Sequence, residues 1–255
     1  MSQSIRIAQI TDCHLPADPE QKYRGATPYK NLKALLKIVR RMKPDLLLAT
    51  GDLSEDGSRA SYERLERCFK PLGIPVLPLP GNHDDASLLA RIFPGSPVDG
   101  ISISAHAAWQ IIRLNSCLPG RPEGGLGGGV LAKLEDVLSR SVGQPRLVAV
   151  HHQPVIVGSP WIDKYRLFES EAFLQLIDRS PDVKAVVWGH VHRVFESVRN
   201  GTVMWGSPSS AINSLPGAKK FTEDPAGPAF RWLELRQDGT LDSEIIRLRV
   251  ATTTK

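Results

Sequence analysis

Five short polar motifs, each placed directly after an apolar run, contain side chains that bind metal ions in proteins. In chain order they are Asp12-Cys13-His14, Gly51-Asp52, Gly81-Asn82-His83-Asp84, His151-His152 and Gly189-His190-Val191-His192. They hold six of the seven histidines in the chain, and only His106 lies elsewhere. Buried polar groups cost free energy unless they are paired, so a cluster of this size requires a compensating charge. The motifs therefore predict one metal site at which the five loops converge.

The ligand types restrict which metal would bind. Histidine and carboxylate ligands without cysteine suit divalent ions such as Mn, Fe, Zn or Co. Asp12 and His14 lie two residues apart, as do His190 and His192, so each pair points to one side of an extended segment. Each pair could clamp one ion or straddle two.

Two further side chains suit a site for two ions. Asp52 stands alone on its loop and has two oxygens that could bridge, while Asn82 offers a neutral carbonyl oxygen. Two ions about 3.5–4 Å apart would activate a water molecule and clamp phosphate oxygens. The residue types therefore favour phosphoryl transfer.

The apolar runs that precede the motifs are typical of buried strands in a parallel sheet. We expect these strands at 5–10, 46–49, 76–79, 146–150 and 183–188. Helical spacing of apolar residues predicts helices at 29–42, 61–69, 86–93, 130–141 and 169–178. Strands that alternate with helices indicate an α/β fold, in which ligands bind beyond the carboxyl ends of the strands.

The C-terminal third has a different pattern. Two hairpins are predicted, because a turn sequence separates two apolar runs at Arg199-Asn200-Gly201 and again at Gln237-Asp238-Gly239. The runs 101–104 and 109–114 are also expected to form a pair of antiparallel strands, although no such turn sequence joins them. Residues 207–227 are rich in small residues, and we expect a functional or mobile loop there. We predict a single domain over 1–255, with two mixed sheets packed face to face and flanked by helices. An antiparallel extension and a capping or dimerisation loop at about 207–230 complete it.

Composition is that of an ordinary globular protein of 255 residues, with 41% hydrophobic residues and a formal charge of +5. The positive charge suits an anionic substrate or is an excess spread over the surface. The three cysteines, Cys13, Cys68 and Cys117, are scattered, which argues against a disulfide framework and fits a reducing compartment. No signal peptide or membrane-spanning run is evident, so we expect a cytoplasmic protein.

The order Asp-x-His, Gly-Asp, Gly-Asn-His-Asp, His-His and Gly-His-x-His, each after an apolar strand, resembles the calcineurin-like metallophosphoesterase superfamily. The resemblance spans residues 5 to about 209 and implies the metallophosphoesterase fold. Thr11 to Leu15, followed by Ala17-Asp18-Pro19, and the tail at 216–239 are closer to one branch. That branch resembles the bacterial class III cyclic nucleotide phosphodiesterases and the related glycerophosphodiesterases.

The resemblance implies two bound metal ions. The implied ligands are Asp12, His14 and His192 for the first ion, Asn82, His190 and a histidine of the 151–152 pair for the second, and Asp52 between them. Relatives often have His-His-Pro-Pro where this chain has His151-His152-Gln153-Pro154. Counting from the end of the preceding strand favours His151, whereas counting back from Pro154 favours His152. We expect His151.

The resemblance also implies catalytic roles. His83 would face the phosphate, where it would protonate the leaving oxygen or stabilise the transition state, and Asp84 would orient it. Asn82, His83 and His192 would contact the substrate. The nucleophile would be a hydroxide that bridges the two ions, so no covalent enzyme intermediate is expected.

The expected substrate is a small phosphodiester, with 3′,5′-cyclic nucleotides first and glycerophosphodiesters or other alkyl diesters as the alternative. A phosphomonoesterase or protein phosphatase would need further cations near the site; no arginine lies in the five motifs, although Arg193 follows the last one. A non-catalytic scaffold should have lost ligands, whereas every expected position is filled. We expect no nucleic-acid polymer or membrane as partner, and a homodimer or higher homo-oligomer remains open.

Four other features have plainer interpretations. Trp161 and Asp163 lie where relatives shape the substrate pocket, although simple loop packing is the alternative. Gly124–Gly129 is expected to be a flexible surface loop, because it does not follow a strand in a βαβ unit. Residues 207–209 are expected to form a tight turn, and His106 is expected to be a surface or loop residue.

Overall fold

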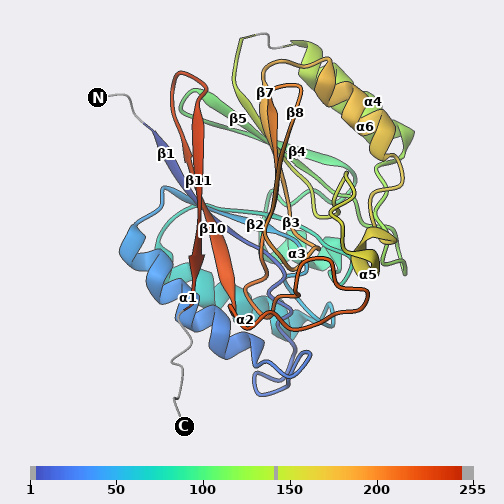
Figure 1. Ribbon diagram of the computed structural model, residues 1–255. Coiled ribbons are helices and arrows are strands. Elements are labelled where there is room, and N and C mark those ends of the chain that lie inside the picture. Colours follow the sequence, from blue (N-terminus) through green and yellow to red (C-terminus); the bar gives the residue numbers. More distant parts are fainter. Residues whose placement is uncertain (1–3, 141–142, 249–255) are drawn as a thin grey trace.

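The computed structural model describes residues 4–140 and 143–248 (Figure 1). The strands are β1 (Ile5–Ile10), β2 (Leu46–Thr50), β3 (Val76–Leu79), β4 (Ile101–His106), β5 (Trp109–Leu114), β6 (Arg146–Ala149), β7 (Val183–Trp188), β8 (Phe195–Arg199), β9 (Thr202–Gly206), β10 (Ala229–Leu235) and β11 (Leu241–Arg247). The helices are α1 (Pro28–Met42), α2 (Arg59–Phe69), α3 (Ala86–Ile92), α4 (Gly127–Arg140), α5 (Pro160–Asp163) and α6 (Ser170–Asp178), with a short 3-10 turn η1 (Lys70–Leu72).

The strands form two mixed sheets, which confirms the predicted fold class. The first sheet has the order β11-β10-β1-β2-β3, and the second has the order β4-β5-β6-β7-β9-β8. Neighbouring strands β1, β2 and β3 are parallel, as are β5, β6 and β7. The C-terminal third was expected to be antiparallel, and this expectation was only partly correct, because β9 pairs with β7 in parallel. The two predicted hairpins therefore extend different sheets.

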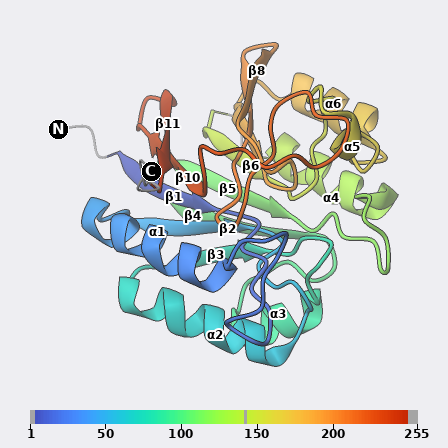
Figure 2. The ribbon, with the colours of Figure 1, turned by 60° about the horizontal axis from the view of Figure 1, so that its bottom comes forward.

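Alternate residues on the inner strands face opposite layers. Leu48 of β2 and Leu147 of β6 join the core between the two sheets, whereas Leu47 packs toward α1 and α2 and Val148 packs toward α4 and α6. Figure 2 shows α1, α2 and α3 over one face and α4 and α6 on the other side. The fold is therefore four layers, with helices outside two sheets that share one apolar interior.

The helix bounds follow local signals that the apolar spacing alone did not give. Ser58 caps α2 by accepting a hydrogen bond of 3.2 Å from the backbone N–H of Ser61, so this helix begins before the predicted position 61. The helix predicted at 130–141 begins at Gly127, and residue 141 lies outside the described residues. The short helix α5 was not predicted. No helix in the described ranges is both long and apolar enough to span a membrane.

Candidate metal centre

The loops after five parallel strands meet at one edge of the two sheets. Within the first sheet, the backbone N–H of Asp12 donates to Gly51 O and that of His14 donates to Asp52 O, both at 2.9 Å. Across the sheets, the backbone N–H of His190 donates to the carboxylate of Asp12 at 3.0 Å. The predicted convergence of the motifs is therefore present in the structure.

Close approach between these loops explains the glycine before His190. A Cβ atom at Gly189 would lie 2.7 Å from Asp12 Oδ2 and 2.9 Å from the Thr50 carbonyl oxygen. Any larger residue would push apart the tips of β1, β2 and β7. Gly189 therefore lets ligands from different sheets share one site.

Asp12, His14 and His192 form one candidate ligand group, and all three are buried. His14 Nε2 lies 3.1 Å from His192 Nε2, which lies 3.3 Å from Asp12 Oδ1. His192 Nδ1 donates to Ile212 O at 2.8 Å, and His14 Nδ1 lies 2.7 Å from Glu55 Oε2. In the neutral rings each Nδ1 thus carries the proton, so two Nε2 lone pairs face each other. A cation relieves that repulsion, so these residues fit a metal ion.

A second group consists of buried atoms that lack a protein partner. Within the described residues, Asn82 Oδ1 and the Nε2 atoms of His151, His152 and His190 accept and donate no hydrogen bond. His151 Nδ1 donates to Thr50 O at 2.8 Å, which leaves its Nε2 as the free ligand atom. Buried polar atoms are normally paired, and oxygen and imidazole nitrogen are metal ligands. This group also fits a metal ion.

Asp52 lies between the two groups. Its Oδ2 is 3.8 Å from His14 Nε2 on one side and 3.4 Å from His151 Nε2 on the other. Burial favours a neutral carboxyl, but the nearby His151, His83 and His14 hold the pKa of Asp52 well below its ordinary value. An ionised carboxylate in this position could bridge two cations.

The structure bears on the choice between His151 and His152. His151 belongs to a group with Asp12 and Asp52 as well as to a group with His152 and His190. His152 belongs only to the latter, and its Nδ1 lies 2.7 Å from Ser116 Oγ. The position of His151 beside Asp52 therefore supports it as the ligand of the second ion.

The glycine run at 124–129 is not a flexible surface loop throughout, and that expectation was wrong for its first half. Gly124 is buried, and a Cβ atom there would lie 2.6 Å from His152 Cβ. The backbone N–H of Leu126 donates to Glu169 at 2.9 Å, and Gly127 opens α4. Gly124 thus packs the loop against the His-His motif and Gly125 is also buried, whereas Gly127, Gly128 and Gly129 are exposed.

His83 lies at the mouth of the site with a partner that the motifs did not reveal. Its Nδ1 is 3.3 Å from Glu55 Oε2, and its backbone N–H donates to Asp52 Oδ1 at 2.9 Å. Burial lowers the pKa of His83, but Asp52 and Glu55 outweigh this and raise it overall. Glu55 follows Asp52 by three residues on the same loop, which is the signal that could have identified it.

Asp84 supports the backbone of the site and has no hydrogen bond to the His83 ring among the described residues. Its carboxylate accepts hydrogen bonds from the backbone N–H groups of Leu53, Ser54 and Gly81 and from the hydroxyl of Tyr62. Burial and the neighbouring Asp52 raise the pKa of Asp84 to about 6, although the backbone donors oppose this. The prediction that Asp84 orients the ring directly finds no contact to support it.

The ligand residues have unusual backbone conformations. Asp12, His14, Asp52, His190 and His192 are five of the nine non-glycine residues with positive φ in the described chain, at 44–64°. Such conformations cost free energy for L-residues and persist where surrounding contacts enforce them. Their concentration here marks the loops as a functional site.

The candidate ligands open into a cavity of about 160 Å³. Its walls include His14, Asp52, Asn82, His83, His190 and His192, together with Tyr23, Arg24, Pro122, Trp161, Ile162 and Tyr165. Trp161 thus lines the cavity, whereas Asp163 accepts hydrogen bonds from the backbone N–H groups of Val157 and Ser159 and shapes the loop. Of the two residues after the His-His motif, only Trp161 reaches the site.

Arg24 is a cation in this cavity that the motifs did not predict. Its guanidinium carbon lies 4.3 Å from the ring centroid of Phe221, 5.4 Å from that of Tyr23 and 6.0 Å from that of Trp161. Tyr23 in turn stacks on His14 with ring centroids 3.9 Å apart. Arg193, by contrast, donates to Val157 O and Ser159 Oγ and so holds a loop.

Residues 207–210 do more than turn the chain. Ser209 Oγ donates to Asp12 O at 2.8 Å, and the backbone N–H of Ser210 donates to Thr11 O at 3.0 Å. Cys13 points away from the site, as expected, and is buried in the core near α1 and α2. The segment after β9 therefore braces the loop that carries Asp12 and His14.

Comparison with known families agrees with the geometry. The sequence profile of calcineurin-like phosphoesterases matches residues 5–194. The chain belongs to the calcineurin-like phosphoesterase family. It is 35% identical over 250 residues to the 3′,5′-cyclic adenosine monophosphate phosphodiesterase CpdA of Vibrio vulnificus, which covers 96% of this chain and 90% of that protein. It is 37% identical to a 3′,5′-cyclic-nucleotide phosphodiesterase of a Nostoc species, with 96% and 92% covered.

Solved structures of low sequence identity share the phosphoesterase fold. A dimetal phosphatase from Danio rerio superposes with a TM-score of 0.69 at 15% identity and covers 95% of this chain and 98% of that one. A purple acid phosphatase from yellow lupin gives a TM-score of 0.71 at 14% identity, over 97% of this chain and 52% of the lupin chain. These two likenesses concern the fold alone.

Proposed function

We propose that this calcineurin-like phosphoesterase hydrolyses small phosphodiesters, in particular 3′,5′-cyclic nucleotides, with two divalent metal ions. The proposal rests on two groups of buried atoms that lie on opposite sides of Asp52. On one side are Asn82 Oδ1 and histidine Nε2 atoms without hydrogen-bond partners among the described residues, and on the other the Nε2 atoms of His14 and His192 face each other. The relatives in Vibrio vulnificus and Nostoc are named as cyclic nucleotide phosphodiesterases. Their similarity extends over nearly the whole chain.

Asp12, His14 and His192 would hold one ion, and Asn82, His151 and His190 would hold the other, with Asp52 shared. A pair of divalent ions supplies a water nucleophile of lowered pKa and neutralises charge on the phosphate oxygens. Which of Mn, Fe, Zn and Co would fill the two positions depends on the availability of each metal as well as on its affinity.

His83 is placed to act on the substrate rather than on a metal. Its side chain is 34% exposed and lines the cavity, and its raised pKa favours the protonated ring near neutral pH. A protonated imidazole can donate to a phosphate oxygen and transfer its proton to the leaving alkoxide. Glu55 Oε2 lies 3.3 Å from His83 Nδ1 and would help to hold the ring in place.

The rim of the cavity suits a substrate with a flat ring. Tyr23 and Trp161 present aromatic surface beside the ligands, and Arg24 places a cation between them. An aromatic base can pack against such side chains, while Arg24 attracts the negative charge of the diester.

The test is a substrate panel with enzyme reconstituted in Mn²⁺. We expect turnover of 3′,5′-cyclic nucleotides and of bis-p-nitrophenyl phosphate, and loss of both in Asp52→Ala together with depletion of bound metal. His83→Ala should lower kcat by roughly 10²–10⁴-fold and leave metal content unchanged. His106→Ala is the matched control, because this histidine lies on β4 outside the site. Loss of metal in His83→Ala would show that its assigned role is wrong.

A phosphomonoesterase is the second candidate, and Arg24 is the observation that favours it. An additional cation in the cavity could bind the dianion of a monoester. Faster hydrolysis of p-nitrophenyl phosphate than of bis-p-nitrophenyl phosphate would establish this alternative. A preference for glycerophosphodiesters over cyclic nucleotides would instead identify glycerophosphodiesters as the diester substrate.

We also propose a cytoplasmic location, because Cys13, Cys68 and Cys117 are all unpaired. A homodimer would use the exposed part of the loop after Ser214, where Leu215 is 39% exposed. Light scattering of the purified protein tests the dimer, and a monomer at micromolar concentration would exclude it.

A further inference from the structure

Loops from distant parts of the chain meet at the ring of Phe221, beside the candidate metal centre. The Arg24 guanidinium carbon lies 4.3 Å from the centroid of this ring. The indole of Trp161 packs edge-on against the ring with centroids 5.3 Å apart, and the imidazole of His192 does so at 5.9 Å. Arg24 and Trp161 line the cavity, whereas Phe221 does not line it and contacts them from outside. The ring thus supports two cavity residues and one candidate ligand.

Arg24 has a backbone conformation that an arginine rarely adopts. Its φ is 49°, and that of Gly25 is 89°. The backbone N–H of Tyr23 donates to Ala26 O and that of Ala26 donates to Tyr23 O, both at 3.0 Å, which closes a tight turn. A positive φ costs free energy in a non-glycine residue and persists where surrounding contacts enforce it. The turn therefore fixes the direction in which the Arg24 side chain leaves the loop.

The side chains at this wall are oriented but keep free hydrogen-bond donors. Arg24 Nε donates to the Tyr23 hydroxyl at 3.1 Å, and the terminal nitrogens of Arg24 make no hydrogen bond or ion pair among the described residues. Trp161 Nε1 is a buried donor that also lacks an acceptor in the described part of the chain. Buried donors are normally paired. These groups therefore fit acceptor atoms of a bound substrate.

The segment 214–223, which carries the Phe221 ring, is attached to both of its neighbours. The backbone N–H of Ser214 donates to His192 O at 2.8 Å. The backbone N–H of Gly217 donates to Ser159 Oγ at 3.1 Å, and Ser159 directly precedes α5. The segment is therefore fixed against the loop of a candidate ligand and against the helix that carries the indole.

We propose that Phe221 is a positioning residue that sets the affinity for the alcohol part of the substrate. It holds Arg24 and Trp161 so that their free donors face a flat ring with acceptor atoms at its edge, as the base of a cyclic nucleotide has. The metal ions and His83 would take the phosphate, which leaves the rest of the substrate to this wall. This role rests on the proposed diester hydrolysis. Because such contacts exist equally before and during bond cleavage, they should affect KM rather than kcat.

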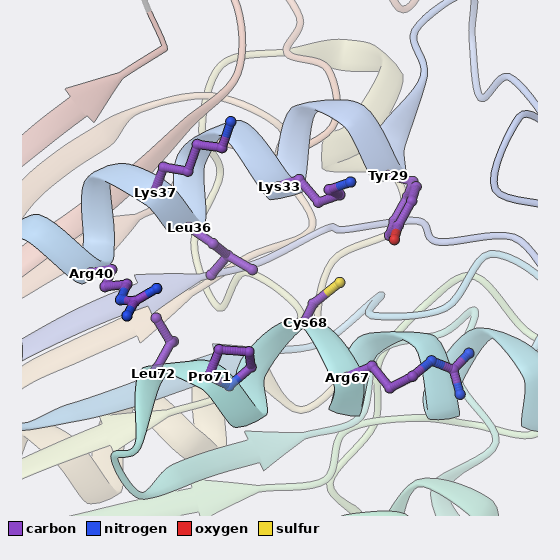
Figure 3. Close-up of a pocket in the computed structure, with 9 residues that line it drawn as sticks. All are labelled: Tyr29, Lys33, Leu36, Lys37, Arg40, Arg67, Cys68, Pro71 and Leu72. Carbon is purple, nitrogen blue, oxygen red and sulfur yellow. The ribbon is translucent and has the colours of Figure 1, made fainter.

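Tyr29 is a matched aromatic residue outside this wall. Figure 3 shows it beside a separate cavity of about 300 Å³ between α1 and α2, with Lys33 directed toward it. Lys33 Nζ lies 5.0 Å from the centroid of the Tyr29 ring, and the Arg64 guanidinium carbon lies 5.6 Å from it. Tyr29 thus makes the same kind of contact with cations without lining the cavity of the candidate metal centre.

The experiment compares Phe221→Leu with Phe221→Tyr in metal-loaded enzyme, with 3′,5′-cyclic adenosine monophosphate as substrate. Leucine keeps apolar bulk without a ring, whereas tyrosine keeps the ring face that the guanidinium contacts. Phe221→Leu should raise KM about tenfold, with kcat and bound metal unchanged. Phe221→Tyr should retain the KM of the wild type, and so should the control Tyr29→Leu.

A double variant tests whether the ring acts through the guanidinium. Arg24→Ala should raise KM by itself. Arg24→Ala combined with Phe221→Leu should raise KM by less than the product of the two single effects, because the two side chains are in contact. Effects that multiply fully would show that Phe221 does not act through Arg24.

The outcomes separate this role from the proposed function. An unchanged KM in Phe221→Leu, or equal KM values in the leucine and tyrosine variants, would overturn the role of the ring while the wild type still hydrolyses the nucleotide. Loss of kcat and bound metal in Phe221→Leu would show that the ring supports His192 instead of the substrate. Failure of the wild type to hydrolyse both the cyclic nucleotide and bis-p-nitrophenyl phosphate would reject the proposed function, and this role with it.

Discussion

Glu55 contacts two imidazole rings of the candidate site at once. Its Oε2 atom lies 2.7 Å from His14 Nδ1 and 3.3 Å from His83 Nδ1. A carboxylate behind a metal-binding histidine fixes the tautomer and raises the basicity of the ligand nitrogen. One side chain thus links a metal ligand to the proposed proton donor.

We predict that Glu55→Gln lowers kcat about 10–100-fold, because an amide is a weaker acceptor for both rings. The pH profile of kcat should also shift to lower pH, since His83 loses a negative charge that raises its pKa. Glu63→Gln, on the exposed face of α2, is the matched control. Unchanged kcat and an unchanged profile in Glu55→Gln would show that the contact is only structural.

His151 should make metal binding depend on pH. Burial lowers the pKa of His151, but the negative charge of Asp52, whose Oδ2 lies 3.4 Å from His151 Nε2, outweighs this and raises the pKa to about 9 in the metal-free protein. The ring is then protonated below about pH 9 and neutral above it, and only the neutral ring can bind metal. Affinity should therefore rise about tenfold per pH unit toward 9.

Chelator competition between pH 7 and 8.5 measures this dependence, and NMR of the metal-free protein follows the His151 ring directly. Burial holds the pKa values of His14 and His190 well below their ordinary range, so these rings should stay neutral over the same interval. A metal affinity that does not change with pH would contradict a protonated His151.

At the residue scale, sequence patterns predicted the candidate ligands that the structure brings together, because strand ends and polar motifs coincide along the chain. They missed Tyr23, Arg24 and Phe221, which lie in loops outside the strand-end motifs and meet only in the folded protein. The contacts of Asp84 were not predicted for the same reason. Its partners, Leu53, Ser54 and Tyr62, come from other segments.

At the element scale, the hairpin of β10 and β11 connects the two sheets through a buried arginine. Arg231 donates to Gly206 O at 3.0 Å and to Glu196 Oε1 at 2.8 Å, both in the second sheet, and to Ser207 Oγ at 3.2 Å. Its side chain is fully buried although it lies on a strand of the first sheet. The segment that braces Asp12 begins at this connection.

Arg231→Ala should lower the free energy of unfolding by about 2 kcal/mol or more, because Gly206 O and Ser207 Oγ lose a buried partner. Urea denaturation measures the change. Arg236→Ala, which removes an exposed ion pair with Asp242 and an exposed hydrogen bond to Thr240 Oγ1, should leave stability within error. Equal effects of the two substitutions would contradict a structural role for the buried contact.

Short apolar runs were sufficient to predict most strands and the two-sheet core. The parallel pairing of β9 with β7 was not predictable, because a turn such as Arg199-Asn200-Gly201 fixes only the β8–β9 hairpin. The early start of α4 was also missed, since glycines usually weaken helices. In this chain Gly127, Gly128 and Gly129 begin α4, directly after the segment in which Gly124 packs against His152.

At the scale of the whole molecule, the candidate site exists only because the two sheets pack face to face. Asp12, Asp52 and Asn82 follow strands of the first sheet, whereas His151 and His190 follow strands of the second. The shared apolar core brings these strand ends together, and the ligand loops contact one another across the interface. A pair of ions would thus join the two halves of the fold.

The most direct measurement is anomalous diffraction from crystals grown with Mn²⁺, recorded on both sides of the manganese edge. Two anomalous peaks are expected, one on each side of Asp52. The first should lie beside Asp12, His14 and His192, and the second beside Asn82 and His190. A single peak, or peaks only outside this cavity, would contradict a centre for two metal ions.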